Sequence, residues 1–209
     1  MHAVLEDLNK IGIVPVIKID DAEKAVPLAK ALVAGGIPCA EVTFRTAQAA
    51  DAIARINAEL CSGEAPEILL GAGTVLTLEQ VDKAIAAGAK FIVTPGFNPK
   101  IVAYCIEKGI PVTPGCSNPS DMELALEMGL EVVKFFPAEQ SGGLEYIKAV
   151  SGPYPSLRFI PTGGINAQNI VKYIAFEKIV ACGGSWMVSA DLIENGEFDK
   201  ITALCREAQ

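Results

Sequence analysis

The chain has 209 residues, of which 51% are hydrophobic and 20% are charged. This length and apolar content predict one domain, residues 1–209, with a large core, and exclude a disordered chain. The net charge is −8 and no two lysines or arginines are adjacent, which argues against a nucleic-acid-binding protein.

Cysteine and histidine usage argues against a metal site. The six cysteines form no CxxC pair, and the single histidine, His2, stands at the N-terminus. The cysteines are therefore interpreted as free thiols in a reducing compartment. The opening MHAVLEDLNKIGIV lacks the long apolar core of a signal peptide, and no run approaches 18 apolar residues. We expect a cytoplasmic protein without a membrane span.

Eight short apolar runs recur at intervals of about 20–28 residues, a spacing typical of strand–helix repeats. They cover residues 13–17, 39–44, 67–73, 90–96, 110–115, 130–137, 157–164 and 178–185.

Helical patterns lie between these runs. Residues 21–34 carry apolar side chains at helical spacing. Residues 78–87, 98–108 and 119–128 each end at a glycine, which is a common helix C-terminal signal. A short N-terminal helix at 3–9 is expected to close one end of the sheet. Eight strand–helix units favour a single (β/α)8 TIM barrel of the α/β class, with an open doubly wound sheet as the alternative.

Lys134 is the first candidate catalytic residue. It lies near the end of the sixth predicted strand, between the apolar pairs Val132-Val133 and Phe135-Phe136. Burial disfavours the charged ammonium, and a neutral amine is the nucleophile that a Schiff base with a ketone requires. The alternative is a lysine whose ammonium group reaches solvent at the strand end.

The second strand supplies a polar triplet. Glu41, Thr43 and Arg45 alternate along AEVTFR and therefore share one face, while Val42 and Phe44 would pack outward. A carboxylate here can move protons, and a guanidinium can bind a carboxylate or phosphate. A structural Glu–Arg ion pair is the alternative.

Glycine-rich turns follow several of the other strands. GAGTVL at 71–76 offers Thr74, and TPG occurs at 94–96 and again at 113–115. PTGGIN at 161–166 and CGGSW at 182–186 follow the last two strands, where TIM barrels often bind phosphate through backbone N–H groups. Tight turns would explain each motif taken alone. Cys116, Cys182 and Trp186 are interpreted as packing residues.

The ordered set of motifs AKALVAGG, EVTFRT, GAGTVL, TPG, KFFPAE, PTGGI and GGSW resembles the KDPG/KHG aldolase family, which acts on 2-dehydro-3-deoxy-phosphogluconate and 4-hydroxy-2-oxoglutarate. The resemblance extends from residue 14 to the C-terminal helix. It implies a lyase of carbohydrate metabolism, as in the Entner–Doudoroff route, that uses no metal and no cofactor and forms a homotrimer.

The resemblance also implies roles for particular residues. Lys134 would form the Schiff base and Glu41 would transfer protons. The residues expected to bind or enclose the substrate, a phosphorylated 2-keto-3-deoxy sugar acid, are Arg45, Thr74, Pro95, Phe136, Thr162, Gly163, Gly164, Gly184 and Ser185. Cleavage would give pyruvate and glyceraldehyde 3-phosphate. The alternatives are an aldolase for the galactonate epimer, a phosphosugar epimerase or isomerase, and a non-catalytic barrel that binds sugar phosphates.

Overall fold

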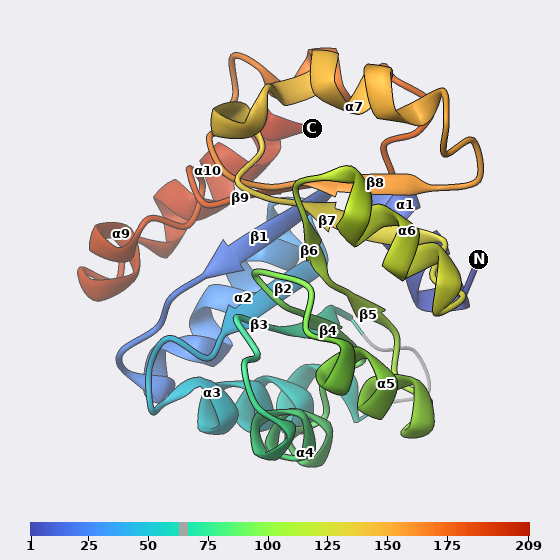
Figure 1. Cartoon of the computed structure of the whole chain (residues 1–209). Helices are drawn as coiled ribbons and strands as arrows, with labels where there is room; N and C mark the ends of the chain where they lie inside the picture. Colours follow the sequence, from blue (N-terminus) through green and yellow to red (C-terminus); the bar gives the residue numbers. More distant parts are fainter. Residues whose placement is uncertain (63–66) are drawn as a thin grey trace.

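The computed structural model describes residues 1–62 and 67–209, in which strands and helices alternate along the chain (Figure 1). Each predicted apolar run contains strand. The strands are β1 (Ile13–Ile17), β2 (Cys39–Thr43), β3 (Leu69–Gly73), β4 (Phe91–Val93), β5 (Val112–Thr113), β6 (Gly115–Cys116), β7 (Val132–Phe135), β8 (Arg158–Pro161) and β9 (Cys182–Gly184).

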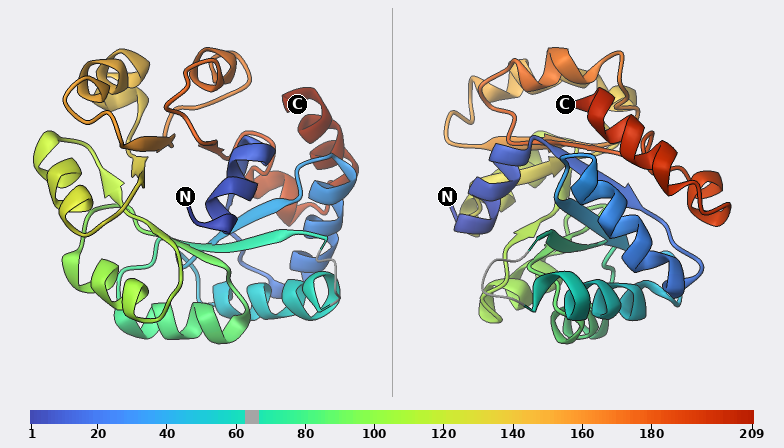
Figure 2. Two further views of the ribbon diagram at one scale, coloured as in Figure 1. Left: turned by 90° about the vertical axis from the view of Figure 1, so that its right-hand side faces the viewer. Right: turned by 180° about the vertical axis from the view of Figure 1, so that it is seen from behind.

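All paired strands are parallel. One sheet has the order β5-β4-β3-β2-β1-β9 and a second has the order β6-β7-β8. Two isolated parallel bridges, Phe159 with Ile179 and Thr162 with Gly183, connect the β8 region to the β9 region. The prediction of an α/β fold is confirmed as a strongly curled parallel sheet with helices on its outer side (Figure 2).

Helices other than the first lie on the outside of this sheet (Figure 2). The helices are α1 (Ala3–Ile11), α2 (Ala25–Ala34), α3 (Ala49–Ile56), α4 (Leu78–Ala87), α5 (Pro99–Glu107), α6 (Pro119–Glu127), α7 (Gly143–Ser151), α8 (Ile170–Ile174), α9 (Ala190–Glu194) and α10 (Phe198–Ala208). Short helical turns η1 (Ala22–Lys24), η2 (Asn57–Cys61) and η3 (Glu139–Ser141) complete the helical segments.

Local sequence signals explain where several helices begin and end. The side chains of Thr77, Asn98 and Asn118 accept hydrogen bonds from backbone N–H groups in the first turns of α4, α5 and α6. Gly88 then ends α4 with a φ of 105°, a left-handed conformation that glycine adopts without a steric penalty. These helix ends fix the length of each connection to the next strand.

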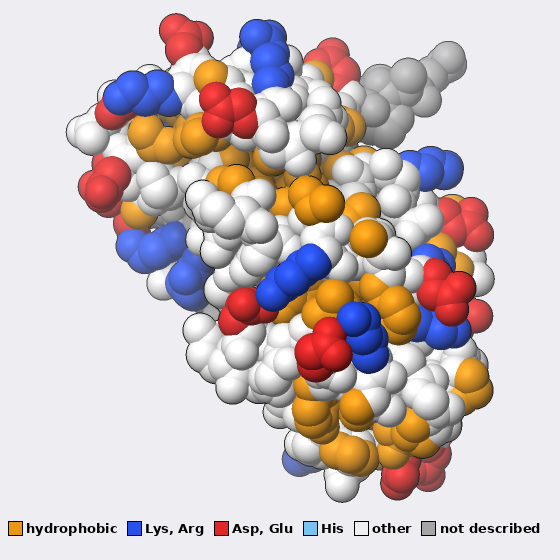
Figure 3. Space-filling view, turned by 90° about the horizontal axis from the view of Figure 1, so that it is seen from above, with side chains coloured by type: hydrophobic (Ala, Val, Ile, Leu, Met, Phe, Trp, Pro, Cys, Tyr) orange, Lys and Arg blue, Asp and Glu red, His pale blue; other side chains and the backbone are white. Residues whose placement is uncertain are grey.

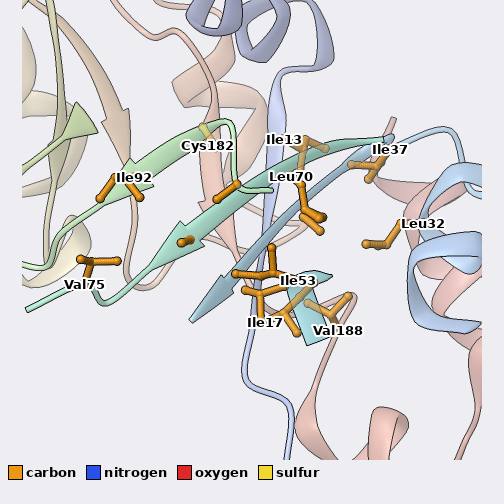
Figure 4. Packing of buried hydrophobic residues seen from close by; sticks show 14 of the residues in the cluster. Ile13, Ile17, Leu32, Ile37, Ile53, Leu70, Val75, Ile92, Cys182 and Val188 are labelled. Atoms are coloured by element: carbon orange, nitrogen blue, oxygen red, sulfur yellow. The ribbon is translucent and has the colours of Figure 1, made fainter. Parts of the chain in front are cut away.

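Alternation along the strands produces two hydrophobic cores. The outer core lies between the sheet and the helices and includes Ile17 of β1, Leu70 of β3 and Ile53 of α3 (Figure 4). The inner core lies inside the curled sheet, and its residues are Leu5, Leu8, Val14, Cys39, Phe91, Val93, Val132, Ile160, Val180 and Ala181.

The N-terminal helix closes one end of the curled sheet, as the sequence predicted. Leu5 and Leu8 of α1 belong to the inner core and are 7% and 1% exposed. The chain enters β1 directly after α1, so this closed end is the one at which the parallel strands begin. Functional side chains therefore have to lie at the opposite end, where the strands finish.

The molecular surface carries charges of both signs. Acidic and basic side chains are interspersed on the face seen from the side of α7 (Figure 3). No helix within residues 1–62 and 67–209 is both long and apolar enough to cross a membrane.

Candidate active site

The two candidate catalytic side chains face each other inside the curled sheet. Lys134 comes from β7 and Glu41 from β2, and they are only 6% and 3% exposed. The Lys134 Nζ lies 3.9 Å from the Glu41 Oε1, which is an ion-pair distance but too long for a good hydrogen bond. The alternative of a lysine reaching bulk solvent does not describe this side chain.

Strand register explains how Lys134 is placed. Lys134 pairs with Gly115 of β6 on one side and with Ile160 of β8 on the other. Its neighbours Val133 and Phe135 point outward into the outer core. The Lys134 Nζ lies 4.9 Å from the centre of the Phe136 ring, on the site side of the strand. The amine is therefore enclosed by apolar and aromatic groups and one carboxylate.

The Glu41 carboxyl is buried without a hydrogen-bond partner for one of its oxygens. Within the described part of the chain, Oε1 has no such partner. Burial raises the pKa of Glu41 above its ordinary value, and the positive charges of Lys134 and Arg45 oppose that rise. A carboxyl in this state can carry a proton closer to neutral pH than an exposed one, as an acid–base catalyst must.

A glycine provides the space for this carboxyl. A Cβ on Gly73 of β3 would lie 2.0 Å from the Glu41 Oε1, so only glycine leaves room for the side chain as it stands. Glycines at a strand end can allow the close approach of a ligand, but these two leave room for protein side chains. The structure shows that Gly73 accommodates Glu41 and that Gly71 accommodates the ring of Phe91.

Arg45 extends from the turn after β2 and is held by Thr43. The Arg45 Nε donates a hydrogen bond of 2.9 Å to the Thr43 Oγ1. The Thr43 hydroxyl in turn donates to the backbone carbonyl of Ile17 at 2.7 Å. The polar triplet thus shares one face, as predicted, but Arg45 bonds to the threonine and forms no ion pair with Glu41 in the described structure.

A pocket of about 180 Å³ opens beside Arg45. It brings together residues that the sequence predicted from four different strand ends. The lining residues are Val16, Arg45, Phe136, Thr162, Gly163, Gly164, Ile165, Gly183, Gly184 and Ser185. Arg45 is the one charged residue in this lining, so the pocket favours an anionic ligand.

Backbone conformation shapes the glycine side of this pocket. Gly163 and Gly164 have φ values of 100° and 78°, which are left-handed conformations that favour glycine. The carbonyl of Gly163 accepts a hydrogen bond from the Glu139 N–H at 3.1 Å. The carbonyl of Gly164 accepts the side-chain amides of Asn166 and Asn169 at 3.2 and 2.9 Å. Both carbonyls are thereby fixed by protein donors.

Neither Pro95 nor Thr74 lines the pocket beside Arg45. The Pro95 carbonyl occupies the space that a Cβ on Gly115 would need, and Gly115 pairs with Lys134. The Pro95 ring lines a separate hollow of about 300 Å³ with Val75 and neighbouring residues. Thr74 follows β3 directly, is half-buried and has a φ of 54°.

Alternation along a strand would place Ala72 and Thr74 on the same face, but the structure does not follow that pattern. Ala72 belongs to the outer core, because Gly71 and Gly73 are the residues of β3 that face inward. The strand ends at Gly73, so strict alternation does not extend to Thr74. The placement of Thr74 follows from its left-handed backbone and not from strand parity.

Cys116 and Cys182 are buried packing residues, as the sequence predicted. Burial raises the pKa of both Cys116 and Cys182 to about 12, which keeps the thiols neutral. Trp186 is half-buried, and its ring fills the space that a Cβ on Gly184 would need. It packs against the outer core, as the sequence predicted.

Comparisons with known proteins agree with this geometry. The sequence profile of the family "KDPG and KHG aldolase" matches residues 4–204. The chain is 50% identical to the 2-dehydro-3-deoxy-phosphogluconate aldolase of Treponema pallidum, covering 99% of this chain and 96% of that protein. It is 45% identical to the KHG/KDPG aldolase of Escherichia coli K12, covering 94% and 90%.

Among solved structures, the KDPG aldolase of Legionella pneumophila matches with a TM-score of 0.92 and 37% identity, covering 98% of both chains. That structure contains pyruvate captured at low pH as a covalent carbinolamine intermediate.

Proposed function

This chain belongs to the KDPG and KHG aldolase family, and on that premise we propose that Lys134 is the residue that carries the Schiff base. The chain is a Schiff-base-forming aldolase, a lyase that cleaves 2-dehydro-3-deoxy-6-phosphogluconate to pyruvate and glyceraldehyde 3-phosphate. The assignment to Lys134 depends mainly on one observation, the buried amine 3.9 Å from the buried Glu41 carboxyl.

The reaction begins with attack of the neutral Lys134 amine on the 2-keto carbon. The resulting carbinolamine loses its hydroxyl as water when the protonated carboxyl of Glu41 donates a proton. This step leaves a protonated imine on Lys134 and a carboxylate at Glu41. Burial favours the protonated form of Glu41 before the step, as its raised pKa indicates.

Carbon–carbon cleavage then uses the same two residues. The Glu41 carboxylate removes the proton of the 4-hydroxyl group as the bond between carbons 3 and 4 breaks. The electron pair of that bond moves to the iminium, which gives an enamine of pyruvate and releases the aldehyde. Glu41 returns its proton to carbon 3, which restores the iminium. Water then hydrolyses the iminium, releasing pyruvate and the Lys134 amine, and the proton set free in this step returns to Glu41.

The remaining site residues hold the substrate in this geometry. Arg45, Thr74 and Thr162 bind its carboxylate, and Pro95 and Phe136 form walls. The backbone N–H groups of Gly163, Gly164 and Gly184, with the Ser185 hydroxyl, bind its phosphate. Support comes from the pocket beside Arg45, where both glycine turns meet a single cation.

Reduction with borohydride in the presence of pyruvate tests the assignment to Lys134. Peptide mass mapping should find a pyruvyl adduct on the peptide that contains Lys134. A Lys134→Met variant should lose the adduct, while Lys148→Met, a change on the exposed surface of α7, should keep it. An adduct on another lysine, or none in the wild type, would contradict the assignment.

We also propose that the chain cleaves 4-hydroxy-2-oxoglutarate to pyruvate and glyoxylate. The named activity of the Escherichia coli relative supports this second substrate. The substrate shares the keto acid end that Lys134, Glu41 and Arg45 contact but has no phosphate. Measurement of pyruvate release from both substrates by one preparation tests the proposal, and no release from 4-hydroxy-2-oxoglutarate would overturn it.

For the fold, we propose one domain, residues 1–209, in which the curled sheet closes as an eight-stranded barrel. Two observations support closure. Strands β5 and β6 are one strand interrupted at Pro114, and the bridge between Thr162 and Gly183 joins β8 to β9, which pairs with β1. A crystal structure with β8 and β9 separated by water would contradict it.

For assembly and location, we propose a homotrimer in the cytoplasm. Leu76 and Leu78, just before and at the start of α4, are 54% and 41% exposed, and a subunit contact over this part of the surface would bury both side chains. The free thiols of all six cysteines support a reducing compartment. Light scattering should give three times the chain mass, and Leu76→Asp should lower it.

A further inference from the structure

A buried threonine hydroxyl lies between the catalytic pair and the one cation of the anion pocket. Thr43 is 1% exposed, and its Oγ1 makes two hydrogen bonds, to Ile17 and from Arg45. The mechanism above uses Arg45 but gives Thr43 no role. The hydrogen bond from Thr43 to Ile17 connects β2 to β1 and has a structural role. The bond from Arg45 to the same hydroxyl has no such role.

The direction of these two bonds is fixed by chemistry. A hydroxyl has one proton to donate and two lone pairs that can accept. The Ile17 carbonyl has no proton, so the Thr43 proton must point to that carbonyl. A lone pair is then left to accept from the Arg45 Nε at 2.9 Å. The backbone of β1 thus determines which way the hydroxyl faces.

This arrangement uses only the inner nitrogen of the guanidinium. Arginine has five N–H donors in a planar fork, and Nε carries one of them. In the described residues the two terminal nitrogens of Arg45 make no ion pair, and Arg45 lines the anion pocket. Fixing Nε and the plane of the group leaves the outer edge free for two parallel bonds to a carboxylate.

We propose that Thr43 is a positioning residue that orients Arg45 toward the substrate carboxylate, an inference that rests on the proposed function. Arg45 is exposed and would otherwise lose considerable rotamer freedom on binding. Holding it in advance lowers that cost, so Thr43 acts on substrate affinity. We prefer the carboxylate over the phosphate because Arg45 is bonded to Thr43 on the strand that carries Glu41, and the substrate carboxylate adjoins the carbon that reacts beside Glu41.

The experiment compares two threonines of the same turn. Thr43→Val keeps the shape of the side chain but removes both hydrogen bonds. The matched control is Thr46→Val, because the Thr46 hydroxyl donates to the Ile19 carbonyl at 2.6 Å and makes no hydrogen bond to the Arg45 side chain in the described structure. Thr43→Ser restores the hydroxyl. Thermal unfolding of each variant separates loss of folding from loss of orientation.

We expect Thr43→Val to raise KM by about 5- to 30-fold for both the phosphorylated and the unphosphorylated substrate, with kcat within about threefold of wild type. Thr43→Ser and Thr46→Val should stay within about twofold of the wild-type KM. In an Arg45→Met background, adding Thr43→Val should have little further effect, because the orienting bond has no partner.

Three outcomes would overturn the proposal. An unchanged KM in a folded Thr43→Val variant excludes the positioning role. A rise for the phosphorylated substrate alone shows that Arg45 serves the phosphate. An equal rise in Thr46→Val attributes the effect to the turn as a whole. Borohydride trapping on wild type reports separately on the Schiff base, so failure of the proposed function is distinguishable from failure of this inference.

Discussion

Replacing Gly73 with alanine should displace the catalytic carboxyl while leaving the sheet intact. The new Cβ would lie 2.0 Å from the Glu41 Oε1 and 2.7 Å from its Cγ and Cδ. Ordinary contact begins at 3.4 Å, so the oxygen must retreat by about 1.4 Å. Misplacement of a reacting group by about 1 Å can cost about 100-fold in rate, so we expect kcat to fall by at least that factor.

Pyruvate release from the phosphorylated substrate, coupled to lactate dehydrogenase, measures this change. The matched control is Gly71→Ala on the same strand, where the new Cβ would lie 2.2 Å from the ring of Phe91 in the inner core. Overpacking there should lower the free energy of unfolding by about 1–3 kcal/mol with a smaller effect on the rate per folded molecule.

The two glycine variants thus separate activity from stability. The reasoning is refuted if folded Gly73→Ala keeps a kcat within about threefold of wild type. It is also refuted if Gly71→Ala, corrected for its folded fraction, loses as much activity as Gly73→Ala.

Four further predictions concern Glu41, the glycine turn after β8 and the buried hydroxyl of Tyr173. Glu41→Gln should lower kcat by about 100- to 10,000-fold while borohydride still traps pyruvate on the lysine, as rate measurements and mass mapping will test. Burial raises the pKa of Glu41, so the folded state holds this proton more tightly than the unfolded chain. The wild-type free energy of unfolding should therefore decrease as pH rises above 4.5 through the folded pKa. Denaturant titrations should find that this pH-dependent decrease is missing in Glu41→Gln. Gly164→Ala should raise KM for the phosphorylated substrate but not for 4-hydroxy-2-oxoglutarate. Gly164 has a φ of 78°, and the new Cβ would lie 2.8 Å from Glu139, so the turn must shift. Equal changes in KM for both substrates would contradict a phosphate role for this turn. Tyr173→Phe removes the hydrogen bond from the buried Tyr173 hydroxyl to Glu139 and should cost about 1 kcal/mol of stability in thermal unfolding, with no loss indicating that the bond contributes nothing.

Periodicity predicted the strand–helix order because each parallel strand is buried on both faces. The run at residues 13–17 coincides with β1, whereas the run at 110–115 is divided into β5 and β6 at Pro114. Proline has no N–H for the ladder, but a single sequence does not show whether neighbouring strands tolerate that loss. Other runs were predicted too long because they included flanking residues, before the strand in β3 and β9 and mainly after it in β8.

The inward placement of Lys134 and Glu41 was predictable for a similar reason. A lysine within an apolar strand is unusual, and so is a glutamate on the inward face of a strand. Each residue can therefore be recognised from its own strand. The role of Gly73 was not predictable, since it depends on a side chain that reaches across from β2. The bond between Thr43 and Arg45 was also missed, because alternation indicates a shared face but not which polar groups bond.

The N-terminal helix has a practical consequence for how this enzyme can be handled. The Met1 amino group pairs with Glu131 at 3.1 Å, just before β7 begins, so the terminus lies at the base of the molecule, away from Lys134 near the other end of that strand. A tether attached there to a bead or an electrode would leave the catalytic entrance facing the solution. Deleting α1 to shorten such a tether would instead open the interior to water at Leu5 and Leu8.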